Sequence, residues 1–73
     1  MPLRPLPYRE VKRRPEAAGF AEHTQKGSHV KFVKQIDVSI VTAVVPRHRE
    51  VAAGTLRSSL RQAGLSVDEW ERL

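Results

Sequence analysis

The sequence predicts an α+β sandwich in which helices cover one face of a three-stranded antiparallel sheet. Two observations carry this prediction. Runs rich in β-branched residues, at 29–34 and 39–45, occupy the middle of the chain. Stretches with helical apolar spacing lie before them, at 7–20, and after them, at 54–65. With a shorter strand at 21–25, the order is α-β-β-β-α, which indicates helices packed on one side of a sheet.

Length and composition restrict the chain to one small domain with a limited apolar core. Its 73 residues include 13 Lys and Arg against 8 Asp and Glu, which gives a net charge of +5. This charge favours a polyanionic partner, either nucleic acid or an acidic protein, although it would also serve merely to keep a small protein in solution. The small core predicts modest stability.

Several classes of protein are excluded by what the sequence lacks. It has no cysteine, which excludes disulfides and thiolate metal sites and fits a cytoplasmic location. No apolar run approaches the roughly 20 residues of a membrane-spanning helix. We also expect no secretory signal, because the start of the chain has no apolar core segment.

The first helix is expected after a short extended lead-in. Residues 1–6 are rich in proline and form this lead-in, and a single domain covers 7–73. Pro7 suits the first position of a helix that Gly19 ends. Pro15 lies inside the segment and has no N–H to donate, so we expect the helix to kink or split there.

The sequence marks the end of the second long strand clearly but not the turn that joins it to the first. The run 39–45 stops at Pro46, which cannot continue a hydrogen-bonded ladder. Between the strands, residues 35–38 contain no Asn-Gly or Asp-Gly pair, so the sequence does not specify the type of turn.

The second helix carries an apolar stripe of Leu56, Leu60 and Ala63. We expect Thr55 to cap its start and Gly64 to end it. After that stop, Ser66 and Glu69 have the spacing of a capping box, which predicts a short final helix carrying Trp70.

A lone histidine, His29, begins the first long strand directly after a turn made of Lys26, Gly27 and Ser28. Strands usually begin with apolar or β-branched residues. An imidazole beside Lys26 and Lys31 would suit proton transfer in a basic setting. The alternative is an ordinary histidine that pairs with a backbone carbonyl at the edge of the sheet.

Four segments in order, AGF, QKGSH, VPRH and GTLRSSLRQAGLS, closely resemble the HicA toxins of bacterial type II toxin–antitoxin systems. The resemblance covers the chain from Val11 to the C-terminus. It implies a fold like that of double-stranded-RNA-binding domains, an RNA-cleaving activity that stops translation, and a cognate HicB antitoxin. It also implies that the histidine of the GSH motif, here His29, is catalytic.

The chain departs from the pattern of these toxins at three places. Pro15 and Ser59 stand where relatives usually carry apolar core residues, and the segment 29–46 is a few residues longer than is common. We expect the first two to lower stability and the third to alter the hairpin. They also leave open an inactive toxin that is retained only to bind its antitoxin.

Metal-independent RNA cleavage needs a base for the 2′-OH proton and donors for the charge on phosphate. We expect His29 to be the general base. Lys26, Ser28 and Lys31 would bind the phosphate, and Gly27 would let the backbone approach it closely. The products would be a 2′,3′-cyclic phosphate and a 5′-hydroxyl. The rival function is a non-catalytic module that binds RNA by shape, since the same fold does so.

For most of the remaining candidate residues, an ordinary solvent-exposed position is an alternative to a functional role. His48 would be the acid for the leaving oxygen, a phosphate contact, or a solvated loop residue, whereas we place His23 on the surface. Arg57 and Arg61 would contact RNA, meet an acidic antitoxin, or form a solvated helix face. The spacing of the three histidines does not suggest a zinc site, and no cofactor is expected.

Three further expectations concern the rest of the chain. The basic run 12–14 would be a further phosphate contact or, by default, a solvated helix face. Phe20 and Trp70 are expected in the core and not on an RNA-stacking surface. For the free protein, a monomer is favoured.

Overall fold

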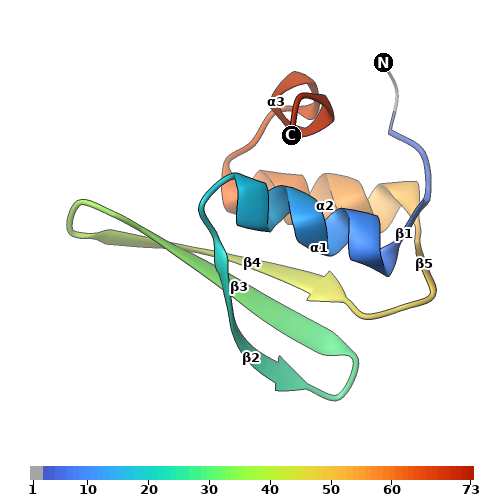
Figure 1. The fold of residues 1–73 in the computed structure, drawn as a ribbon, viewed down its shortest axis with the longest axis horizontal. Coiled ribbons are helices and arrows are strands. Elements are labelled where there is room, and N and C mark those ends of the chain that lie inside the picture. Colours follow the sequence, from blue (N-terminus) through green and yellow to red (C-terminus); the bar gives the residue numbers. More distant parts are fainter. Residues whose placement is uncertain (1–2) are drawn as a thin grey trace.

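The computed structural model describes residues 3–73, so the first two residues of the expected lead-in lie outside its described part. A three-stranded antiparallel sheet, in the order β2-β3-β4, carries two long helices on one side (Figure 1). This confirms the α-β-β-β-α fold predicted from the sequence. The main elements are α1 (Tyr8–Ala17), β2 (Ala21–Lys26), β3 (His29–Ile36), β4 (Ser39–Pro46), α2 (Ala53–Ala63) and α3 (Val67–Glu71).

The central strand is β3, which pairs with β2 through a two-residue turn and with β4 through another. Gly27 and Ser28 form the first turn, and Asp37 and Val38 form the second. The backbone φ is +60° at Gly27 and +54° at Asp37. In each hairpin, therefore, the first turn residue has the left-handed backbone that matches the twist of the strands.

Side-chain alternation divides the sheet into a core face and an open face. Val30 and Phe32 of β3 are fully buried, as is Val45 of the neighbouring strand. The helices cover this face, and residues from every main element except β2 join the core: Val11, Phe20, Val30, Phe32, Ala43, Val45, Leu56, Leu60 and Trp70. The other face of the sheet carries His29 and Lys31, which are both exposed.

The expected break at Pro15 is wrong, because α1 runs through it to Ala17 as one helix (Figure 1). Pro15 lies in the last turn, and its own carbonyl accepts a hydrogen bond from the N–H of Phe20 at 2.9 Å. The N–H of Gly19 bonds the carbonyl of Glu16 at 3.1 Å, and Gly19 has φ +95°. These two bonds form a Schellman ending, which fixes the last turn although Pro15 donates nothing.

The second helix begins earlier than predicted. It starts at Ala53 with Ala52 as its N-cap, so Thr55 lies inside the first turn and caps nothing. Its end is as expected, because Gly64 adopts φ +73° and the N–H of Leu65 bonds the carbonyl of Leu60 at 3.0 Å. Glycine at this position allows the left-handed backbone of the ending.

The capping box of α3 is confirmed. The Ser66 hydroxyl accepts from the N–H of Glu69 at 3.1 Å, and the Glu69 carboxylate accepts from the N–H of Ser66 at 3.0 Å. The hydrogen bond from the backbone N–H of Ser66, and next its hydroxyl, lower the pKa of the Glu69 carboxyl. The box turns the chain so that Trp70 packs into the core. The centre of its ring lies 5.2 Å from the guanidinium carbon of Arg14.

A second, two-stranded pairing was not predicted. β1 (Leu6–Pro7) pairs antiparallel with β5 (Glu50–Val51), and Leu3 is buried against the core. The described part of the lead-in therefore packs on the domain and holds the loop after β4. Across residues 3–73, no helix combines the length and apolar character needed to cross a membrane.

Candidate active site at the end of the central strand

The turn before His29 has a conformation that favours glycine at its first position. Lys26 and His29 are opposed across the turn, with Gly27 and Ser28 between them. A Cβ on Gly27 would meet no atom within 4 Å, so space does not explain this glycine. Its φ of +60° does, because side chains other than glycine are strained there.

His29 lies on the open face between the two neighbouring strands. It is opposite Lys26 of β2 and opposite Pro46 of β4. Two residues along the strand, Lys31 shares this face and is opposite Thr24. Residues opposed across an antiparallel pair hold their Cβ atoms about 4.5–5.5 Å apart. The imidazole therefore has one lysine beside it and a second lysine on the same face.

The open face leaves these side chains accessible to a large ligand. Lys26, Ser28, His29 and Lys31 are all exposed, whereas Val30 between them is fully buried. His29 also stands on the central strand, β3. A polymer chain lying across this end of the sheet would meet a proton acceptor and two cations together.

The loop after β4 is joined to the same turn. The backbone N–H of Arg47 donates to the carbonyl of Ser28. His48 follows directly and is exposed. The structure thus brings the two segments that carry His29 and His48 together, although they are far apart in the sequence.

Two positioning residues escaped the sequence analysis. The Gln25 side-chain amide donates to the carbonyl of Gly27 at 3.0 Å and accepts from the guanidinium of Arg47 at 3.3 Å. Arg47 in turn lies over the ring of Tyr8, with its guanidinium carbon 5.7 Å from the ring centre. This network connects the turn, the loop and the start of α1. Gln25 stands in the QKGSH segment and Arg47 in the VPRH segment, but the sequence pattern assigns neither residue a role.

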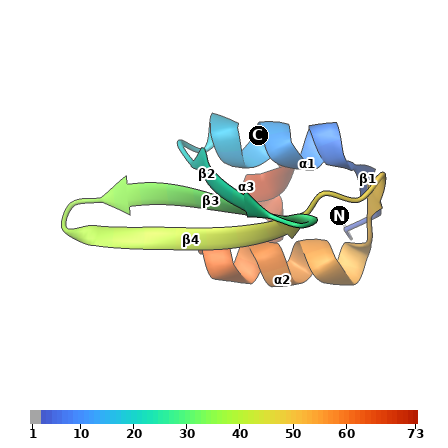
Figure 2. The same ribbon diagram turned by 90° about the horizontal axis from the view of Figure 1, so that it is seen from below.

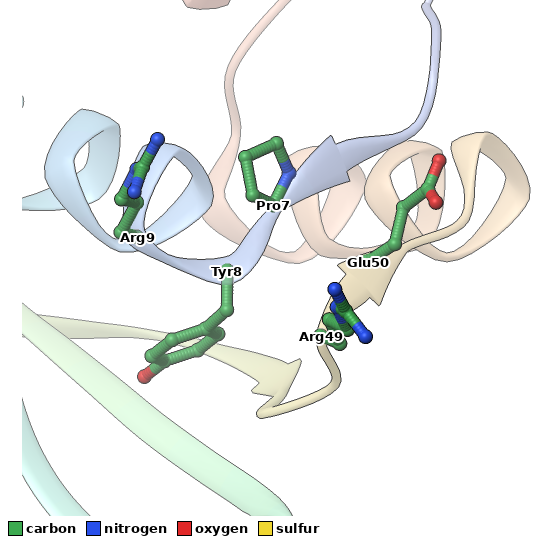
Figure 3. Close-up of a pocket in the computed structure, with 5 residues that line it drawn as sticks. All are labelled: Pro7, Tyr8, Arg9, Arg49 and Glu50. Carbon is green, nitrogen blue, oxygen red and sulfur yellow. The ribbon is translucent and has the colours of Figure 1, made fainter.

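A shallow hollow lies beside this network, at the junction of β1, β5 and α1. It is lined by Pro7, Tyr8, Arg9, Arg49 and Glu50, and Figure 3 shows Tyr8 and Arg9 pointing in opposite directions from it. Burial, and next the charge of Glu22, raise the pKa of Tyr8.

The other basic candidate residues do not belong to the cluster around His29. Lys12 and Arg13 of the run 12–14 face acidic partners, Glu22 at 3.8 Å and Glu10 at 3.2 Å. Arg57 and Arg61 are exposed on α2, and His23 is exposed at the bulge of β2.

The aromatic side chains expected in the core are there, since Phe20 and Trp70 are both buried. Within residues 3–73, no three side chains of His, Asp or Glu lie close enough to hold one metal ion.

Comparison with known proteins identifies a family for most of the chain. A family model described as the HicA toxin of bacterial toxin–antitoxin systems matches residues 8–65. This match spans α1, the whole sheet and α2, and it includes every candidate residue at the end of β3. Among curated proteins, none matches the sequence.

Proposed function

Because the chain belongs to the HicA toxin family of bacterial toxin–antitoxin systems, we propose that it is an RNA endonuclease that cleaves mRNA in the cytoplasm and stops translation. A HicB-like antitoxin would hold it inactive. The observation that supports this function best is the exposed cluster on the open face, where His29 is opposite Lys26 and shares the face with Lys31.

The cleavage follows from the chemistry of these groups. Neutral His29 accepts the proton of a ribose 2′-OH, and the 2′-oxygen attacks the adjacent phosphorus. The bond from phosphorus to the 5′-oxygen breaks, which leaves a 2′,3′-cyclic phosphate and a 5′-hydroxyl. Lys26, Lys31 and the Ser28 hydroxyl stabilise the added charge on the phosphate. The leaving 5′-oxygen takes its proton from His48 or from water.

The sharpest test separates cleavage from binding. His29→Ala is expected to lower the cleavage rate by about 100-fold or more, since general bases contribute factors of this size. RNA affinity should change little, because it comes mainly from cations that contact phosphate. Labelled RNA incubated with each variant, with binding measured in parallel, gives both quantities. Cleavage should also persist in EDTA, because the proposed reaction uses only protein groups.

His23→Ala is the matched control, since it removes an exposed histidine of the neighbouring strand outside the cluster. It should cut like the wild type. If His29→Ala also cuts like the wild type, the proposed base is wrong. If the wild type binds RNA and never cuts it, the protein is the non-catalytic binding module.

A further inference from the structure

The β3–β4 hairpin carries an exposed apolar edge at its outer end, remote from His29. Val38 is 98% exposed, Ile40 68% and Ile36 47%. Figures 1 and 2 show this end of the hairpin extending past both long helices. Exposed apolar residues that occur singly are ordinary, but Val38 and Ile40 lie two residues apart at the turn and start of β4 and indicate a contact surface along that strand. Ile36 belongs to β3, and its side chain lies on the face opposite to that of Ile40.

Among residues 3–73, no strand pairs with the backbone groups along the free edge of β4. Its position in the sheet is outermost, with β3 on its inner side. At Val44, the outward N–H donates to the Gln62 side chain and the outward carbonyl accepts from the Ser59 hydroxyl, each at 2.8 Å. Backbone groups of every second residue point the same way in an antiparallel strand. Those of Thr42 and Ile40 therefore point outward as well, beyond the side chains of α2 that cover Val44.

This edge lacks the features that keep edge strands from pairing. Proteins usually protect an edge with lysine, proline or a bulge. Residues 38–45 contain no charged residue and no proline, although Asp37 precedes them in the turn and Pro46 ends the strand, and the register with β3 is unbroken. The segment is thus suited to receive another strand.

We propose that the occupant is a second copy of this chain, whose β4 pairs antiparallel with this one to form a six-stranded sheet. We place Ile40 opposite Ile40 of the second copy, across a two-fold axis. In this register Val38 of each copy lies opposite Thr42 of the other. A register centred nearer Val44 would need the N–H and the carbonyl of Val44, which already form hydrogen bonds with Gln62 and Ser59. Pairing by β-strand addition supplies hydrogen bonds from the main chain and contacts from alternate side chains.

The charge distribution favours this contact over others between two copies. A net charge of +5 opposes self-association, yet residues 35–46 contain no Lys or Arg. The cationic cluster lies at the opposite end of β3, seven residues or about 23 Å away at roughly 3.3 Å per residue. Paired hairpin ends therefore keep the two clusters apart and leave both open faces free.

Light scattering of the full chain over a range of concentrations tests the proposal. The wild type is expected to form dimers, and Ile40→Lys to remain monomeric. Ile36→Lys is the matched control, because it adds the same charge at the same end of the hairpin but on β3, where Ile36 pairs with Ser39 inside the hairpin and away from the free edge of β4. Thermal melts establish that both variants fold. A wild type that stays monomeric at every concentration, or a dimer that Ile36→Lys disrupts equally, would overturn the proposal.

The proposed register can be tested by cross-linking a single introduced cysteine, because the chain has no cysteine of its own. Ile40→Cys should form a disulfide-linked dimer under mild oxidation, because the Cα atoms of such a pair are about 5.5 Å apart. Ile36→Cys should cross-link much more slowly. If Ile40→Lys instead leaves a monomeric wild type unchanged in mass and weakens its complex with the antitoxin, the edge binds the antitoxin and the dimer is wrong.

Discussion

At the scale of single residues, the site depends on side chains and backbone conformations that the open face makes available. Gly27 supplies a left-handed turn that an alanine would strain by roughly 1–2 kcal/mol. Gln25 and Arg47 hold that turn against the loop after β4. Lys31 then stands on the same face as His29, while its neighbours Val30 and Phe32 are buried.

Lys31→Met should weaken RNA binding and reduce its dependence on salt. Each phosphate contact that is lost lowers the slope of log affinity against log salt by about 0.7 for single strands. Lys34→Met is the control, because Lys34 lies on the same strand but donates to the carbonyl of Ala18 at 2.6 Å. Filter binding over a salt series measures both slopes. Equal slopes for the two variants would remove Lys31 from the proposed phosphate site.

At the scale of elements, the structure treats the two unusual core residues differently. Pro15 is buried in the last turn of α1 and leaves the Val11 carbonyl without its helical donor. Ser59 is also buried, but its hydroxyl donates to the Val44 carbonyl and so joins α2 to the outer edge of β4. We therefore expect Pro15 to lower the stability of the domain, whereas the hydrogen bond of Ser59 argues against the same expectation for that residue.

Thermal melts should show opposite effects at these two positions. Pro15→Leu restores a helix donor, and proline costs a helix interior about 3 kcal/mol, so the melting temperature should rise. Ser59→Ala leaves a buried carbonyl unpaired and should cost about 1 kcal/mol, or roughly 4–8 °C in a domain of this size. Ser59→Ile should not stabilise, for the same reason. A gain in melting temperature for Ser59→Ile would show that apolar packing outweighs the hydrogen bond.

At the scale of the whole molecule, function is separated along the sheet. The cationic end carries the proposed cleavage site, and the hairpin end, which has no Lys or Arg over 35–46, carries the proposed contact between copies. An acidic antitoxin that masks the site must therefore bind at the cationic end, where opposite charge also speeds encounter.

Binding of a HicB-like antitoxin should weaken as salt rises, and RNA should compete with it. Titration calorimetry over a salt series measures the first, and displacement of labelled RNA measures the second. Ile40→Lys should leave this affinity unchanged, since it alters the other end of the hairpin. An antitoxin complex that still cleaves RNA would contradict the assignment of the site to the face around His29.

The sequence by itself determined the order of the elements and the residues of the GSH turn. Periodicity placed β3 and β4, and local cap signals placed the end of α2 and the capping box of α3, because these features depend on neighbouring residues alone. Its position at a strand start beside two lysines made His29 a candidate, and family resemblance then favoured a catalytic role over a structural one.

Only the tertiary structure decided which side chains meet. The pairing of β1 with β5 is too short to leave a periodic signal, and the early start of α2 has no side-chain cap to mark it. The network from Gln25 through Arg47 to Tyr8, and the bond from Ser59 to Val44, join residues far apart in the chain. Such contacts follow from how the sheet and helices pack, so spacing along the sequence cannot reveal them.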